Sequence, residues 1–129
     1  MSRVQLALNV SNLDEAVDFY RKLFGTEPAK RRPGYANFAI AEPPLKLVLF
    51  ENQRQAGTLN HLGVEVESTA EVVAATRRLA AEGLPTAVEE GVTCCHALQD
   101  KVWVSGADTR WEVYTVLADA PEAATSCCA

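Results

Sequence analysis

The sequence of 129 residues lacks several features that would assign it to a broad class of proteins. It has no apolar run close to the ~20 residues that a membrane-spanning helix needs, which argues against membrane residence. Its net charge is −5, and its basic clusters, Lys30–Arg32 and Arg77–Arg78, form no stripe that would contact nucleic acid. No apolar signal-peptide segment follows Met1, so we expect a cytoplasmic protein.

The cysteines are few and are not distributed along the chain. All four lie in two vicinal pairs, Cys94-Cys95 and Cys127-Cys128. Secreted domains use separated cysteines to close loops, and adjacent cysteines close almost none, so we expect free thiols. Two adjacent thiolates can chelate a soft centre such as trivalent arsenic or cadmium. Redox sensing, or burial as small hydrophobic residues, is the alternative.

The first half of the chain has a clear order of secondary structure. Residues Val4 to Val10 alternate in polarity, which is typical of a half-buried strand. Asn12 and Glu15 form a capping-box pair that begins a helix, and Gly25 ends it. Three short strands are expected near residues 29–32, 35–40 and 45–50.

The second half repeats this order. His61–Val66 resembles Gln5–Val10, 56 residues later, and Ser68 with Glu71 repeats the helix cap. Strands are expected near residues 86–90, 99–104 and 111–117. The repeat predicts an α+β fold in a single domain, residues 1–129, made of two βαβββ modules at residues 3–51 and 59–118. Residues 119–129 are expected to be a disordered, cysteine-containing tail. Two modules in one chain can complete a site, so a monomer or a homodimer is consistent.

The two halves differ in length at one place. Aligning their last strands puts Lys46 opposite Glu112, but 41 residues separate Gln5 from Lys46 and 51 separate His61 from Glu112. The surplus falls at residues 91–99, which include Cys94. The cysteine segment is therefore expected to be a flexible insertion, and insertions on a rigid scaffold often carry function.

Gln5, His61 and Glu112 lie near the starts of predicted strands. If the modules pair about a pseudo-twofold axis, these side chains converge in a cleft. An imidazole, a carboxylate and an amide oxygen suit Fe(II), Mn(II), Ni(II) or Co(II), with coordination positions left open for substrate. The alternative is that all three are ordinary polar or hydrogen-bonded strand residues.

The chain resembles the vicinal oxygen chelate superfamily of glyoxalases, extradiol dioxygenases and antibiotic-resistance proteins. More narrowly, it resembles the arsenic–carbon lyases and cadmium-induced proteins of bacteria. The resemblance spans nearly the whole chain, and its most specific segments are residues 4–10, 35–40, 60–64, 94–104 and 111–114.

The resemblance implies a glyoxalase-like fold with a metal-centred cleft. It implies a non-heme Fe(II) dioxygenase of the extradiol type that uses O2 to split the C–As bond of trivalent methyl- and aryl-arsenicals and releases arsenite. Gln5, His61 and Glu112 would be the catalytic metal ligands, and Cys94 and Cys95 would bind the arsenic. Ni, Co or Mn could replace iron.

Other residues and functions are also weighed. Lys101 is a candidate for stabilising developing negative charge, with a solvated lysine as the alternative. Tyr35 is a candidate for lining the substrate cavity, with core packing as the alternative. The sequence departs from the family at Gln5, where many lyases have His, and at His96, where an aromatic residue is common. The competing functions are a non-catalytic Cd(II) or As(III) sequestrant and a glyoxalase-like isomerase. The isomerase is disfavoured because Lys46 occupies the fourth ligand position.

Overall fold

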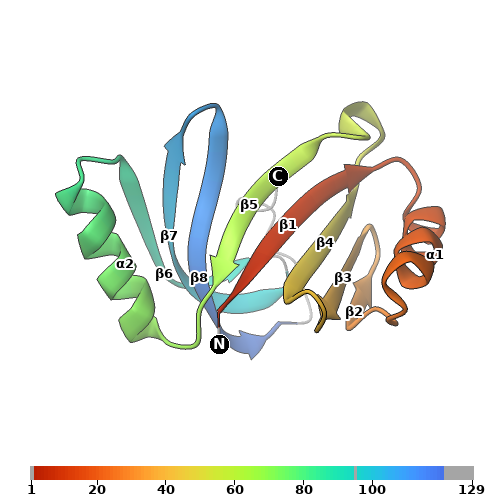
Figure 1. The fold of residues 1–129 in the computed structure, drawn as a ribbon, viewed down its shortest axis with the longest axis horizontal. Helices are drawn as coiled ribbons and strands as arrows, with labels where there is room; N and C mark the ends of the chain where they lie inside the picture. The colour runs from red at the N-terminus through yellow and green to blue at the C-terminus, as the bar shows by residue number, and fades with distance from the viewer. Residues whose placement is uncertain (1, 95, 121–129) are drawn as a thin grey trace. The chain divides into compact units, whose positions relative to one another are not determined.

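A computed structural model describes residues 2–94 and 96–120 of the chain. Within these residues it contains eight β-strands and two α-helices, together with one 3-10 helix (Figure 1). Their order is strand, helix and three strands, twice over, which confirms the predicted α+β fold of two βαβββ modules. By their contacts the residues divide into two compact units. The first unit spans residues 3–62, and the second unit comprises Ser2 and the described residues from Gly63 onward.

The first unit contains β1 (Arg3–Val10), α1 (Leu13–Phe24), β2 (Lys30–Arg32), β3 (Tyr35–Ile40), β4 (Leu45–Glu51), η1 (Gln53–Gln55) and the start of β5 (Leu59–Glu65). The Asn12 side-chain oxygen accepts a hydrogen bond from the Glu15 backbone N–H at 3.0 Å and caps α1. Gly25 ends the helix in the left-handed conformation, at φ 61°. Both ends lie where the sequence predicted them, because both signals are local.

The sheet of the first unit separates an apolar face from a polar one. Its strands follow the order β2-β3-β4-β1-β5, with β1 parallel to β4. Leu6 and Leu8 pack with the core residues Leu13 and Val17 of α1. Because side chains alternate along a strand, the buried residues Gln5, Ala7 and Asn9 of β1 occupy the face opposite that core.

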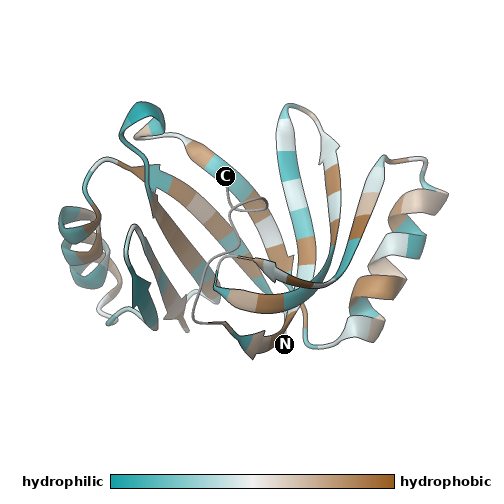
Figure 2. Cartoon of the chain, turned by 180° about the vertical axis from the view of Figure 1, so that it is seen from behind, coloured by the Kyte–Doolittle hydropathy of each residue, from teal (hydrophilic) through white to brown (hydrophobic). Residues whose placement is uncertain are grey.

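The second unit contains the end of β5, α2 (Thr69–Ala81), β6 (Thr86–Cys94), β7 (Ala97–Gly106) and β8 (Thr109–Asp119). Its strands follow the order β5-β8-β7-β6, and β6, β7 and β8 pair antiparallel. Ser68 caps α2 by accepting from the Glu71 N–H at 3.3 Å. Hydrophobic and hydrophilic bands alternate along its strands (Figure 2). Neither helix in the described part of the chain is long and apolar enough to cross a membrane.

The segment around the first cysteine pair differs from its prediction. We expected residues 91–99 to be a flexible insertion, but β6 continues to Cys94 and β7 begins at Ala97, and these two residues are paired. A bulge between Glu89 and Val92, where Gly91 has a left-handed φ of 58°, takes up one extra residue of β6, and most of the surplus lies in the greater length of β6 and β7 compared with β2 and β3. The β6–β7 hairpin is therefore lengthened and kinked instead of interrupted.

Candidate functional site

Two of the predicted metal ligands meet inside the first unit. Gln5 on β1 and His61 on β5 bring their side-chain nitrogens Nε2 to 3.2 Å from each other. Their exposed fractions are 5% and 2%, so the contact is shielded from solvent. The repeat predicted this pair, because equivalent positions in two neighbouring strands face the same side of the sheet.

The surroundings of His61 include residues that the sequence analysis missed. Its Nδ1 lies 2.7 Å from the side-chain oxygen of Asn60, and its ring centroid lies 6.4 Å from that of Phe50. The polar residue directly before a candidate ligand was the signal that could have pointed to Asn60. Asn60 matters because a ligating histidine usually depends on the partner of its other ring nitrogen.

Tyr35, the candidate for the substrate cavity, is a buried residue of β3 in the first unit. Its ring packs edge-on against Phe50, with centroids 5.6 Å apart. Its hydroxyl accepts a hydrogen bond from the Asn37 side chain at 2.9 Å. Phe50 thus links Tyr35 to His61 by ring contacts, while contact between Tyr35 and a substrate remains a prediction.

Glu112, the third predicted ligand, belongs to β8 of the second unit. Its Oε1 lies 2.9 Å from the ammonium of Lys101, and the two side chains are 3% and 1% exposed. The ammonium also lies 5.2 Å from the ring centroid of Trp103 and 5.8 Å from that of Tyr114. Lys101 is therefore a buried ion-pair partner, and the alternative of a solvated lysine is wrong.

The donor types in these two places fit a divalent transition metal. A shielded imidazole nitrogen beside an amide, together with a buried carboxylate, provides the N/O set that Fe(II) and its neighbours accept. Neither unit, among its described residues, gathers three His, Cys, Asp or Glu side chains at one point. The convergence of Glu112 with Gln5 and His61 remains a prediction.

Cys94 is disulfide-bonded, which corrects the expectation of free thiols for this residue. That expectation came from the adjacency of the cysteines and the presumed cytoplasmic compartment, whereas the oxidation state depends on the redox poise and on which sulfurs approach each other. Cys94 is fully buried at the end of β6, and its carbonyl accepts from the Gln99 side chain at 2.7 Å. His96 follows with a left-handed φ of 68°. Cys95, with its predicted arsenic-binding role, lies outside the described residues, as do Cys127 and Cys128 of the predicted tail.

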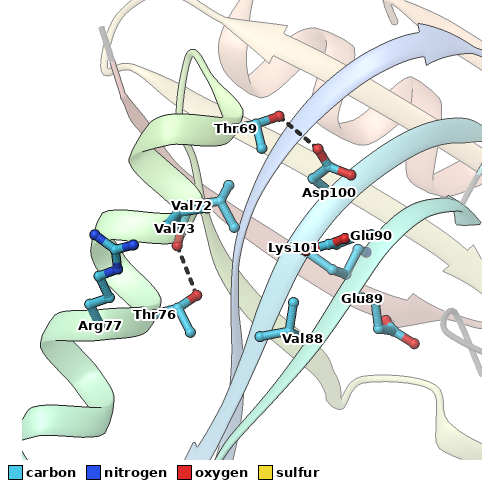
Figure 3. Close-up of a pocket in the computed structure, with 10 residues that line it drawn as sticks. All are labelled: Thr69, Val72, Val73, Thr76, Arg77, Val88, Glu89, Glu90, Asp100 and Lys101. Atoms are coloured by element: carbon cyan, nitrogen blue, oxygen red, sulfur yellow. Dashed lines mark hydrogen bonds between the residues drawn. The ribbon is translucent and has the colours of Figure 1, made fainter.

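A crevice of about 220 Å³ lies between α2 and strands β6 and β7 (Figure 3). Val72, Val73 and Val88 supply its apolar lining, and Asp100 points to the helix and accepts from the Thr69 hydroxyl at 2.6 Å. This hydrogen bond, followed by one from the Gly91 N–H, lowers the pKa of Asp100. The crevice is also lined by Lys101 of β7. It holds none of the predicted metal ligands.

The fold agrees with the comparison to known families. The family model of the Glyoxalase/Bleomycin resistance protein/Dioxygenase superfamily matches residues 3–109. The chain belongs to this superfamily.

Comparison with individual proteins is more specific than the superfamily match. The chain is 67% identical over 120 residues to the cadmium-induced protein CadI of Mycobacterium tuberculosis, covering 92% of this chain and 79% of that protein. It is 58% identical over 134 residues to a trivalent organoarsenical cleaving enzyme of Thermomonospora curvata, covering 99% and 89%.

Solved structures agree on the fold. The Mn(II)-bound glyoxalase of Novosphingobium aromaticivorans has a TM-score of 0.64 at 20% identity, covering 96% of this chain and 43% of that one. The methylmalonyl-CoA epimerase of M. tuberculosis has a TM-score of 0.60 at 15% identity, covering 87% and 85%. At these identities the likeness concerns the fold alone.

Proposed function

We propose that this protein is a non-heme Fe(II) enzyme that uses O2 to cleave the C–As bond of trivalent organoarsenicals and releases arsenite. The observation that carries the proposal is the 58% identity, across 99% of the chain, to a protein named trivalent organoarsenical cleaving enzyme. A protein of the same name from a Bacillus species is 40% identical over 99% of this chain. Similarity of this extent supports shared chemistry as well as a shared fold.

The metal would be held by the imidazole Nε2 of His61, the amide oxygen of Gln5 and the carboxylate of Glu112. The 3.2 Å contact between Gln5 and His61 supports two members of this set. Bound Fe(II) supplies the redox and Lewis-acid chemistry that activation of O2 requires. Burial of all three side chains keeps bulk water away from the reacting groups. Lys101, whose ammonium lies 2.9 Å from the Glu112 carboxylate, would hold that carboxylate in position.

Cys94 and Cys95 would bind the substrate through its arsenic. Trivalent arsenic prefers soft sulfur ligands, and two S–As bonds form as two arsenic-bound hydroxyls leave as water with the thiol protons. Because Cys94 is disulfide-bonded in the structure, it must first be reduced. We place the protein in the cytoplasm, where low-molecular-weight thiols would supply that reduction.

The test is turnover of methylarsenite by the full chain with Fe(II), a thiol reductant and air, with arsenite measured by chromatography and elemental mass spectrometry. We expect arsenite from the wild-type protein and none without oxygen. Cys94→Ser and Glu112→Gln should each abolish it. Glu27→Gln is the matched control, because this glutamate side chain is 78% exposed. Equal arsenite production under nitrogen would refute the dioxygenase chemistry.

A second candidate is a sequestrant that binds Cd(II) or As(III) through its thiols without turnover. The 67% identity to a protein named cadmium-induced favours it. Adjacent thiolates bind both soft cations, so binding alone does not separate the two functions. Stoichiometric retention of arsenic with no arsenite released, in reduced and iron-loaded protein, would support the sequestrant and exclude the lyase.

A further inference from the structure

A chain of side-chain hydrogen bonds leads away from His61 in the first unit. The Asn60 oxygen lies 2.7 Å from His61 Nδ1, and the Asn60 amide nitrogen donates to Asn9 Oδ1 at 3.2 Å. The Asn9 amide nitrogen donates to the Thr58 hydroxyl at 3.1 Å. That hydroxyl donates to the backbone carbonyl of Gln55 at 2.5 Å. We call this hydrogen-bonded set, which consists of Gln55, Thr58, Asn9, Asn60 and His61, the relay.

The relay has only one consistent direction. The Gln55 carbonyl can only accept, so the Thr58 hydrogen is used there and its oxygen accepts from the Asn9 amide nitrogen. The orientations of the Asn9 and Asn60 side-chain amides are then fixed in turn, because the nitrogen of each amide donates to one neighbour and its oxygen must face the next donor. The last oxygen, on Asn60, therefore faces His61 Nδ1, and an amide oxygen can only accept. His61 Nδ1 carries the proton.

The contact at the other ring nitrogen is consistent with this tautomer. His61 Nε2 lies 3.2 Å from Gln5 Nε2, and an amide nitrogen has hydrogens to donate but no lone pair to offer. His61 Nε2 must therefore be the acceptor. Both contacts fit a neutral imidazole with its proton on Nδ1 and its lone pair on Nε2.

We propose that Asn60 is a positioning residue that fixes this tautomer of His61, so that Nε2 is the nitrogen available to a metal. The inference rests on the proposed function for the metal, while the tautomer itself stands on the relay. Without the Asn60 oxygen the ring proton can move to Nε2, where it blocks the lone pair. An amide nitrogen cannot ligate a cation, so Gln5 must turn its side-chain amide to offer Oε1.

The first test reads the tautomer in metal-free, ¹⁵N-labelled protein by long-range ¹H–¹⁵N correlation of the histidine rings. The chain has two histidines, and His96→Asn identifies the His61 signals. We expect a protonated Nδ1 and an unprotonated Nε2 in the wild-type protein. Asn60→Leu should move the proton toward Nε2, and Asn60→Asp, which keeps an acceptor oxygen, should restore the wild-type pattern. Unchanged ring shifts in Asn60→Leu would overturn the proposal.

The second test measures affinity for Mn(II) by calorimetry on the same variants. We expect Asn60→Leu to weaken binding about 10- to 100-fold, the usual effect of losing the partner of a ligating histidine. Asn12→Ala is the control for lost stability, because Asn12 caps α1 and has no part in the relay. An equal loss of affinity in both variants would overturn the positioning role. If instead His61→Ala binds Mn(II) as tightly as the wild type, the proposed metal site fails while the tautomer result stands.

Discussion

Removal of the Lys101 ammonium should destabilise the metal-free protein strongly. At 2.9 Å from Glu112 Oε1, its Coulomb attraction amounts to about 6 kcal/mol at an effective dielectric constant of about 20. Desolvation of the two buried ions offsets much of this in the intact pair. Lys101→Met removes the attraction and leaves the carboxylate desolvated, so the expected loss in the free energy of unfolding is about 3–5 kcal/mol.

The assay is urea unfolding with a chelator present, and the chain offers a matched control. Lys22 and Asp18 form an ion pair with the same 2.9 Å separation, but their side chains are 67% and 52% exposed. Solvent screens such a pair, so Lys22→Met should lower the free energy of unfolding far less than Lys101→Met does. Adding Glu112→Gln to Lys101→Met should recover most of the loss, because the buried charge is then removed. If Lys101→Met costs no more than Lys22→Met, the assignment of a strong buried pair is wrong.

Three more results are expected. Because hydrogen bonds from Thr69 and Gly91 lower the pKa of Asp100, its charged form stabilises the fold above the unfolded pKa of about 4, and this contribution is lost as pH falls through the folded pKa. As pH is lowered, the free energy of unfolding should fall less steeply in Asp100→Asn than in the wild type, and equal slopes would contradict this. Gly91→Ala should cost about 1–2 kcal/mol in thermal unfolding because of its left-handed φ, whereas Gly106→Ala, at a glycine with ordinary φ, should cost less. Oxidised protein should bind no phenylarsine oxide at Cys94 until a thiol reductant is added, as followed by intact mass, and labelling without reduction would refute the requirement.

Features of the fold with local causes could be predicted from the sequence. Asn12 and Gly25 define α1, because a cap acts within a few residues of its own position. The bulge at Gly91 could not be predicted, since it depends on how β6 registers against β7 over residues distant in the chain. The surplus of residues at this place therefore predicts an inserted segment, whereas in the structure it lengthens a hairpin.

The candidate site was predictable to the extent that the repeat encodes it. Equivalent positions in two copies of one strand gave the contact of Gln5 with His61. The partners of each ligand were not encoded in this way: Asn60 and Lys101 meet their partners through side-chain conformation and burial. The oxidation of Cys94 also has no sequence signal, because it depends on the surrounding redox poise.

The relay ends at Gln55, in the exposed turn that joins the two sequence repeats. Such connectors usually tolerate length changes and new chain termini, because little packs against them. Here the connector sets the direction of every amide up to the imidazole. A circular permutant opened between Gln55 and Thr58 should therefore fold as the parent protein does. It should nevertheless lose control of which His61 ring nitrogen bears the hydrogen. The connector between the duplicated halves is thus itself a functional part.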